Sequence, residues 1–182
     1  MRPVPKVVLP TGFGINCEAE TAHAFGLVGA NVTLIHTNDL MDDPSVMARA
    51  QVLALAGGFS FGDHLGAGRV LANRLSCRLG KYLAKFVADG GLVLGICNGF
   101  QTMIRLGLLS ADNSGIQKVS LATNQHGAFY DGWVSLGVDP VSPCVFTRGL
   151  DYLELPVRHG EGRFIAANGI LKKVQQDHLA PI

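Results

Sequence analysis

The sequence carries few charged residues and almost no net charge. Only 16% of its 182 residues are Asp, Glu, Lys or Arg, and 15 basic against 14 acidic side chains give a formal charge of +1. A chain this close to neutral lacks the electrostatic footprint with which proteins bind nucleic acid or an anionic membrane. We therefore expect neither among its partners, and a small polar or zwitterionic substrate fits better.

Cysteine is scarce and is never paired at short spacing. Residues 17, 77, 97 and 144 are the four cysteines, and no Cys-x-x-Cys occurs, which argues against a zinc site and against a dense disulfide framework. The apolar runs are too short to span a bilayer, and the first residues lack the apolar stretch of a signal peptide. These absences predict reduced thiols, no metal site and a cytoplasmic location.

Short apolar runs alternate with a helical pattern through the first 109 residues. Four runs predict buried strands, at residues 6–9 (ended by Pro10), 30–36, 51–56 and 91–96. Between the last two runs, apolar side chains recur at helical spacing over 70–89. Such alternation predicts a mostly parallel sheet flanked by helices, in which ligands bind beyond the carboxyl ends of the strands.

The pattern changes after residue 109. Short strand candidates separated by turns occur at 119–122, 133–138, 144–146, 152–157 and 163–166, and a helix is expected over 170–178. This half is predicted to be mostly antiparallel β. The expected fold class is therefore α/β, a parallel sheet with an antiparallel β-rich second half, in one domain over 1–182.

The strongest chemical signal is a cysteine between two glycines at the end of the fourth apolar run. Cys97 is followed at once by a predicted helix, and Gly95 and Gly99 stand two residues before and after it. Glycines at these positions let a strand turn sharply into a helix and expose a nucleophile at the top of a sheet. We interpret Cys97 as the nucleophile, since a cysteine that only fills a core needs no flanking glycines.

Several other residues are candidates to support such a thiol. Gly57 and Gly58 follow the third strand, where backbone N–H groups could face a developing oxyanion together with the N–H of Asn98. Gln101 lies one helical turn after the cysteine and could bind an amino-acid substrate. His159 also suggests a base, with Glu161 two residues on as its orienting partner.

Four separated segments together resemble one known family. Residues 95–101 (Gly-Ile-Cys-Asn-Gly-Phe-Gln) and 57–63 (Gly-Gly-Phe-Ser-Phe-Gly-Asp) resemble the class I glutamine amidotransferases. Residues 14–18 (Gly-Ile-Asn-Cys-Glu) and 159–164 (His-Gly-Glu-Gly-Arg-Phe) are similar, more narrowly, to the glutaminase subunit or domain of phosphoribosylformylglycinamidine synthase. The four segments occur in order over nearly the whole chain, so the resemblance is specific.

The resemblance implies a flavodoxin-like fold and a defined reaction. In this family a cysteine attacks the side-chain amide of glutamine, a thioester forms as ammonia leaves, and water then releases glutamate. A synthetase uses that ammonia with ATP and Mg to convert formylglycinamide ribonucleotide to its amidine in purine biosynthesis. The implied partners are glutamine, the synthetase large subunit and a small accessory subunit, and no cofactor is expected in this chain.

The resemblance also implies roles for individual residues. Cys97 would be the nucleophile, Gly57, Gly58 and Asn98 would form the oxyanion hole, and Gln101 would bind glutamine. The family's catalytic His and Glu belong to a Pro-His-Pro-Glu-Arg motif nearer the carboxyl end, and no His-Pro-Glu occurs in these 182 residues. We therefore do not transfer those roles to His159 and Glu161. We expect the chain to be the amino-terminal portion of a longer domain, truncated before the part that holds the His-Pro-Glu motif.

Two alternative functions remain open on the sequence. The chain could be a cysteine-elbow protein of the related chaperone and deglycase superfamily, although the glutamate pattern of those proteins is not evident near Cys97. It could also be a non-catalytic amidotransferase-like subunit that binds and regulates a synthetase. The intact Cys97 and Gln101 speak against such decay.

Overall fold

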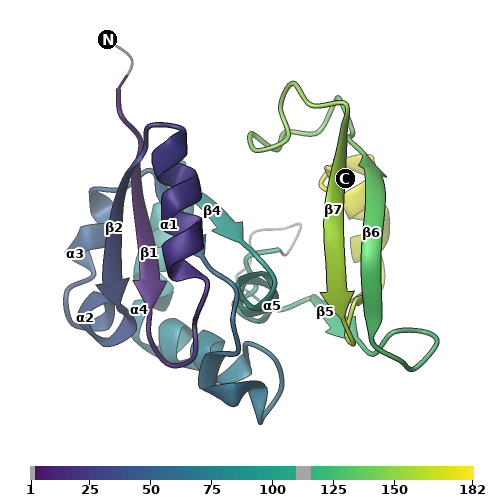
Figure 1. Ribbon diagram of the computed structural model, residues 1–182, viewed down its shortest axis with the longest axis horizontal. Coiled ribbons are helices and arrows are strands. Elements are labelled where there is room, and N and C mark those ends of the chain that lie inside the picture. The colour runs from purple at the N-terminus through teal and green to yellow at the C-terminus, as the bar shows by residue number, and fades with distance from the viewer. Residues whose placement is uncertain (1–2, 110–115) are drawn as a thin grey trace. The chain divides into compact units, whose positions relative to one another are not determined.

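A computed structural model describes residues 3–109 and 116–182 of the chain. It divides into two compact units, one ending at Leu108 and the other beginning at Leu109. Figure 1 draws both units and labels most of their helices and strands.

The N-terminal unit is built on a four-stranded parallel sheet, in the order β2-β1-β3-β4. Its strands are β1 (Lys6–Thr11), β2 (Asn31–His36), β3 (Val52–Leu55) and β4 (Leu92–Gly95). Its helices are α1 (Glu18–Leu27), α2 (Thr37–Asp42), α3 (Ser45–Ala48), the 3-10 turn η1 (Ser60–Asp63), α4 (Arg69–Ala88) and α5 (Asn98–Arg105). Helix α1 lies on one face of the sheet and α4 on the other (Figure 1), as right-handed crossovers between parallel strands require. The predicted parallel sheet flanked by helices is confirmed.

Helix α4 covers the sheet with a continuous apolar stripe. Its buried side chains recur every three or four residues, and they are Leu71, Ala72, Leu75, Leu79, Leu83 and Phe86. This spacing keeps one face of the helix on the core over its whole length, as the sequence predicted for residues 70–89. In the described part of the chain, no helix combines the length and apolarity that a membrane span requires.

Only the two central strands of the sheet are fully buried. Side chains from Val7 to Pro10 in β1 and from Val52 to Leu55 in β3 are inaccessible, whereas β2 is largely exposed and β4 is half-buried. The prediction of four buried strands was therefore wrong for β2 and β4. These two lie at the edges of the sheet, where a strand has a neighbour on one side only.

Pro10 does not end the first strand, contrary to expectation. It lies inside β1 and pairs with Ile35 of β2, and the strand continues to Thr11. The pairing of β1 with β3 covers only Val7 and Val8. Because the pairing of β1 with β3 does not extend to Pro10, the missing N–H of this proline interrupts no hydrogen bonds between those two strands.

The C-terminal unit contains two antiparallel strand pairs and one helix. Strand β5 (Val119–Ala122) pairs with β8 (Arg163–Ala166), β6 (Tyr130–Gly137) pairs with β7 (Tyr152–His159), and α6 spans Ile170–Gln176. The antiparallel β character of this half is confirmed. The strand predicted at 144–146 is absent from the described residues, because the segment is a turn in which the Thr147 hydroxyl donates to the Cys144 carbonyl at 3.4 Å.

Helix α5 packs so closely on β3 that one of its residues must be glycine. A Cβ added to Gly99 would overlap the backbone carbonyl of Leu55. Replacing Gly99 by Ala should therefore lower the free energy of unfolding by about 2 kcal/mol or more, since backbone must move to admit the methyl group. Chemical denaturation followed by circular dichroism measures this loss.

Gly80 provides a matched control within α4. The nearest atom to a Cβ at Gly80 is the Ser76 hydroxyl oxygen at 3.9 Å. The change Gly80→Ala should leave stability unchanged or raise it by up to about 1 kcal/mol, because Ala favours helix more than Gly. Equal stability of the two alanine variants would contradict the close packing of α5 on β3.

Candidate active site

Cys97 occupies a strained backbone conformation between β4 and α5. Its φ is 51° and its ψ is −112°, a left-handed conformation that residues other than glycine rarely adopt. The residue is exposed and its thiol is free. Such strain persists only where the surrounding structure holds it, and it is typical of a nucleophile at a strand-to-helix turn.

The pairing of β3 with β4 brings the Gly57-Gly58 turn beside this cysteine. Leu55 pairs with Gly95 at the ends of the two strands, and the Ile96 N–H donates to the Leu55 carbonyl at 3.0 Å. The residues that follow each strand therefore leave the sheet side by side. A Cβ on Gly57 would lie 3.4 Å from the Cys97 Cβ, so the predicted neighbourhood of these two residues is present.

The loop after β1 joins the same edge of the sheet. Both the Asn16 and Cys17 N–H groups donate to the Gly57 carbonyl at 3.3 Å, and the Phe59 N–H donates to the Gly14 carbonyl at 2.8 Å. A Cβ on Gly58, whose φ is +144°, would lie 2.6 Å from that same Gly14 carbonyl oxygen. The two loops are thus joined like a short antiparallel pair, with Gly58 opposite Ile15.

The side chain of Asn98 fixes the second loop to the start of α5. Asn98 is 1% exposed, and its Oδ1 accepts the Ser60 N–H at 3.2 Å. Its Nδ2 donates to the two carboxylate oxygens of Asp63 at 2.9 and 3.1 Å. Asp63 in turn accepts the Gly68 N–H at 3.2 Å, just before α4 begins. One buried amide therefore holds the residue after the cysteine against the Gly57–Asp63 loop.

Two backbone N–H groups beside the cysteine lack acceptors. Within the described residues, neither the N–H of Gly58 nor that of Asn98 takes part in a hydrogen bond. Asn98 is the first residue of α5, so its N–H is among those that a helix leaves unpaired. Gly58 and Asn98 are two of the three residues, with Gly57, that the sequence predicted for an oxyanion hole.

Gln101 lies on the same face of α5, as its spacing predicted. Its N–H donates to the Cys97 carbonyl at 3.1 Å, and its Oε1 accepts from the Asn98 Nδ2 at 3.3 Å. The carbonyl end of this amide is therefore engaged by Asn98. Within the described part of the chain, its NH2 end donates no hydrogen bond.

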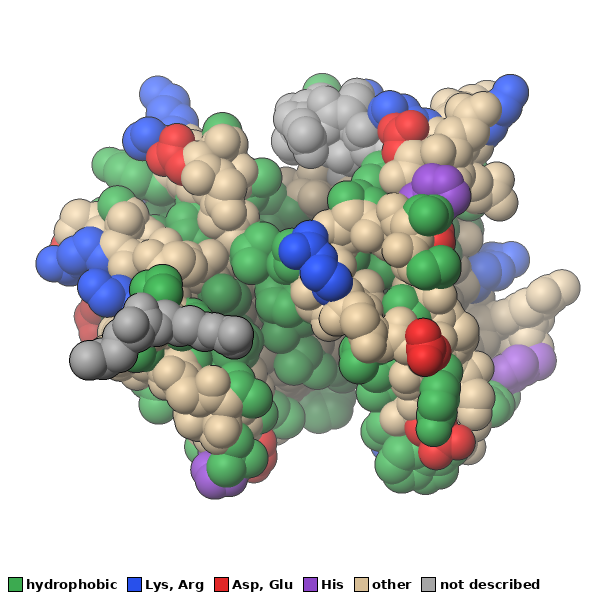
Figure 2. All heavy atoms as spheres, turned by 90° about the horizontal axis from the view of Figure 1, so that it is seen from above, with side chains coloured by type: hydrophobic (Ala, Val, Ile, Leu, Met, Phe, Trp, Pro, Cys, Tyr) green, Lys and Arg blue, Asp and Glu red, His purple; other side chains and the backbone are tan. Residues whose placement is uncertain are grey.

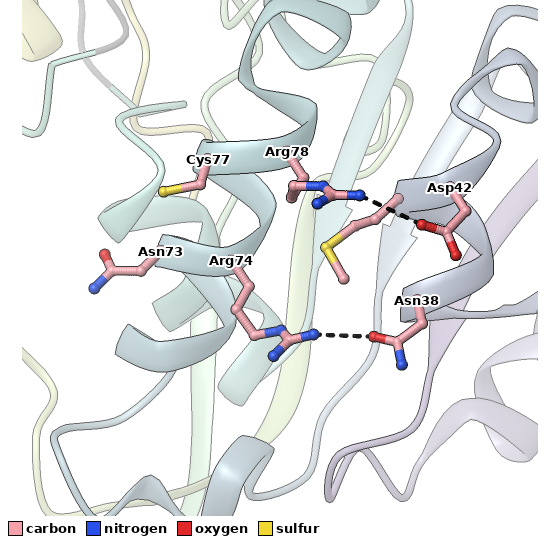
Figure 3. Close-up of a pocket in the computed structure, with 7 residues that line it drawn as sticks. Asn38, Asp42, Asn73, Arg74, Cys77 and Arg78 are labelled. Atoms are coloured by element: carbon pink, nitrogen blue, oxygen red, sulfur yellow. Dashed lines mark hydrogen bonds and ion pairs between the residues drawn. The ribbon is translucent and has the colours of Figure 1, made fainter.

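Two stacked aromatic rings join the loop after β1 to the turn η1, beside a surface pocket. Phe13 and Phe61 stack with centroids 4.6 Å apart, and the Arg74 guanidinium lies 4.9 Å from the Phe13 centroid. Arg74 also donates to Asn38 at 3.0 Å across a pocket of about 580 Å³ between α2 and α4 (Figure 3). None of the predicted site residues lines this pocket. We interpret Arg74 as a support for the loops.

His159 does not interact with the partner that the sequence suggested for it. Its Nδ1 lies 3.0 Å from the Asn124 Oδ1, and that oxygen also accepts the Gly162 N–H at 2.9 Å. In the described residues no hydrogen bond or ion pair joins His159 to Glu161, which is exposed. The suggested pairing was wrong because the strand β7 ends at His159, so the two residues do not share a strand face.

The charges and metal-binding side chains of the described residues are dispersed. Over residues 3–109 and 116–182, no group of three His, Cys, Asp or Glu side chains could hold a metal ion. On the face drawn in Figure 2, Lys and Arg side chains occur in several separate places among apolar and acidic ones.

Comparisons with known proteins agree on one family. The family model described as the CobB/CobQ-like glutamine amidotransferase domain matches residues 4–182, which includes both units. The chain is 44% identical over 174 residues to the phosphoribosylformylglycinamidine synthase subunit PurQ of Dehalococcoides mccartyi, covering 96% of this chain and 68% of that protein. It is 43% identical over 163 residues to the protein of the same name from Methanococcus maripaludis, covering 88% of this chain and 60% of that protein. The chain thus spans about two thirds or less of the length of these relatives.

Solved structures share the fold. A chain in the structure of PurLQS from Thermotoga maritima matches with a TM-score of 0.70 at 28% identity, covering 92% of this chain and 72% of that one. A second Thermotoga maritima structure, of a glutamine amidotransferase, matches with a TM-score of 0.55 at 18% identity, covering 92% and 65%, and shows the fold alone. The predicted resemblance is confirmed: the chain belongs to the CobB/CobQ-like glutamine amidotransferase family, together with the phosphoribosylformylglycinamidine synthase subunit PurQ.

Proposed function

We propose that this chain is the glutaminase component of a phosphoribosylformylglycinamidine synthase. It would hydrolyse glutamine to glutamate and supply ammonia for the conversion of formylglycinamide ribonucleotide to formylglycinamidine ribonucleotide in de novo purine biosynthesis. The observation that carries the proposal is the exposed thiol of Cys97 in its strained turn, beside two unpaired N–H groups. Relatives that bear the PurQ name support the choice of pathway.

The first chemical step is the attack of the Cys97 sulfur on the side-chain carbonyl carbon of glutamine. A carbon–sulfur bond forms and the carbonyl oxygen becomes an oxyanion. Because Cys97 precedes α5 and lies at the carboxyl ends of the strands, its sulfur is reached from solvent and not from the core. The carbon–nitrogen bond then breaks, ammonia leaves with an added proton, and water later releases glutamate from the thioester.

The developing oxyanion would be held by the N–H groups of Gly58 and Asn98. Both are free of other partners in the described residues, so they need no rearrangement when charge develops. Donors that are fixed in advance stabilise a transition state more than mobile water does, typically by about 3 to 4 kcal/mol for one donor. Gly57 contributes by admitting Cys97 close to its backbone, since it has no side chain.

Gln101 would bind the glutamine substrate through its free NH2 end. Asn98 occupies its carbonyl oxygen at 3.3 Å, which fixes which end of the amide faces outward. An amide NH2 can donate to a carboxylate or carbonyl of an amino acid. This explains why a glutamine side chain stands at that position and a plain apolar residue does not.

Among the residues that the structure describes, no side chain is assigned as the proton donor to the leaving ammonia. No hydrogen bond between Cys97 and a histidine is present in the described residues, and the sequence holds no His-Pro-Glu. Loss of one member of such a catalytic unit typically costs about 10⁴-fold or more in rate. We therefore expect Cys97 in these 182 residues to react readily with alkylating agents, and glutamine to be hydrolysed slowly.

The ammonia acceptor and the complex belong to the same proposal. We propose that a synthetase large subunit and a small accessory subunit are the partners, and that ATP and Mg are used by the synthetase. The solved neighbour titled PurLQS supports an assembly of this kind. A cytoplasmic location follows from the proposed pathway.

A glutamine-analogue alkylating agent tests the nucleophile. Treatment with 6-diazo-5-oxo-norleucine should label Cys97, because the analogue enters as glutamine does and presents its reactive carbon to the sulfur. Digestion and mass spectrometry locate the label. Excess glutamine should protect the thiol, and Cys97→Ser should abolish the label.

The control is Cys77→Ser, which removes an exposed thiol on α4. This variant should be labelled like the wild type. Labelling at another cysteine, or none at all in folded protein, would favour the non-catalytic alternative. A rate of glutamine hydrolysis typical of complete glutaminases would refute the expectation of slow turnover.

Asn98→Ala tests whether the buried amide prepares the glutamine site. The change releases Gln101, Ser60 and Asp63 together, so the inactivation constant KI for the glutamine analogue should rise at least about tenfold, as expected for a loss of about 1.4 kcal/mol. The rate of alkylation by iodoacetamide, which needs only the thiol, should change much less.

Asn73→Ala serves as the matched control, because Asn73 is exposed on α4. It should leave both reactions unchanged. Thermal unfolding of each variant by circular dichroism separates a local effect from loss of the fold. If Asn98→Ala slowed both alkylating agents equally in folded protein, the amide would act on the thiol and not on glutamine binding.

A further inference from the structure

A second thiol lies beside the proposed nucleophile and has no role in the proposed reaction. Cys17 and Cys97 are both exposed and unpaired. A Cβ on Gly57 would meet the Cys97 Cβ at 3.4 Å and the Cys17 Sγ at 3.7 Å. Two cysteines that are 80 positions apart in the sequence therefore border the same glycine.

The backbone of Cys17 is held at this position by several hydrogen bonds. Its N–H donates to the Gly57 carbonyl at 3.3 Å. Its carbonyl accepts the Thr21 N–H at 3.1 Å and the buried Thr21 hydroxyl at 2.6 Å, at the start of α1. By contrast, its sulfur makes one weak contact, to the Asn16 Oδ1 at 3.4 Å. The backbone of Cys17 is therefore fixed, whereas a rotation of its side chain would break only this one weak hydrogen bond.

We infer that Cys17 and Cys97 form a reversible disulfide that blocks the nucleophile when the protein meets a hydroperoxide. The inference rests on the proposed function, because it concerns regulation of the same thiol. Glycine at position 57 makes it sterically feasible, since no side chain separates the two cysteines there. A disulfide would occupy the sulfur that must attack glutamine, so oxidation would stop the reaction without destroying the site.

The chemistry balances with hydrogen peroxide as the oxidant. The Cys97 thiolate attacks one peroxide oxygen, the O–O bond breaks, and Cys97 sulfenic acid and hydroxide result. The Cys17 sulfur then attacks the Cys97 sulfur, the S–O bond breaks, and the disulfide forms with loss of water. A dithiol reductant returns both thiols by exchange.

The surroundings of Cys17 favour Cys97 as the thiol that peroxide oxidises and Cys17 as the thiol that then forms the disulfide. Loss of solvent around its sulfur raises the pKa of the Cys17 thiol, and the carboxylates of Glu20 and Glu18 and the neighbouring Cys97 raise it further. A thiol kept protonated reacts slowly with peroxide, because the thiolate is the nucleophile. Cys17 is therefore not expected to be the thiol that peroxide oxidises first, and it is its place beside Gly57 that makes it the partner for a sulfenic acid on Cys97.

Mass spectrometry of the oxidised full chain tests the inference directly. The 182-residue protein is treated with a small excess of hydrogen peroxide, remaining thiols are blocked with N-ethylmaleimide, and trypsin is applied without reductant. The expected product links the tryptic peptides 7–49 and 86–105, which carry the two cysteines. Dithiothreitol should separate them. Cys17→Ser and Cys97→Ser should lack the linked peptide, and the control Cys77→Ser should retain it.

A second measurement connects the disulfide to the proposed function. After peroxide, wild-type protein should lose labelling by the glutamine analogue and regain it with dithiothreitol. Cys17→Ser should be labelled normally before oxidation but should stay unlabelled afterwards, because its sulfenic acid proceeds to irreversible sulfinic acid. Equal recovery of both proteins, or linkage of Cys97 to another cysteine, would overturn the inference. Absence of labelling in reduced wild-type protein would instead count against the proposed function.

Discussion

The arrangement of the site depends on one buried amide, that of Asn98. Burying an amide costs free energy unless its hydrogen bonds are made, and here Ser60, Asp63 and Gln101 provide them. The backbone of Asn98 begins α5, while its side chain holds the loop that follows β3. The thiol, the glycine turn and the residue at 101 therefore cannot move independently. This coupling is what lets loops, which are usually the mobile parts of a fold, hold a reactive geometry.

The strain at Cys97 is maintained by the packing around it. A left-handed conformation at a residue with a side chain costs roughly 1 to 3 kcal/mol, and it persists only if neighbours prevent relaxation. A Cβ at Gly95 or Gly99 would overlap atoms of Met103 or Leu55, so the strand, the turn and the helix are locked together at close range. The two glycines are therefore required by packing, in addition to the turn that the sequence suggested.

Much of the fold and the centre of the site could be predicted from the sequence. Apolar periodicity is a local property, and it predicted β1, β3, α4 and the antiparallel half. Cys97, Gly58, Asn98 and Gln101 follow strand ends, so their shared edge was predictable from topology alone. What could not be predicted depends on distant partners. Whether Pro10 interrupts a ladder depends on where the pairing of β1 with β3 ends, and the partner of His159 is Asn124, 35 residues away.

The same reasoning explains why the sequence showed neither the role of Asp63 in the site nor the place of Cys17 beside it. Asp63 follows a glycine in a turn, where an acidic residue is ordinary, and its role arises only because Asn98 approaches from another element. Cys17 lies after a different strand, and only the pairing of its loop with Gly57 brings it to Cys97. Spacing along the chain identifies groups that can react, because those must stand at strand ends. The groups that position or protect them are selected by contacts between loops, and a sequence shows these only after the loops have been placed.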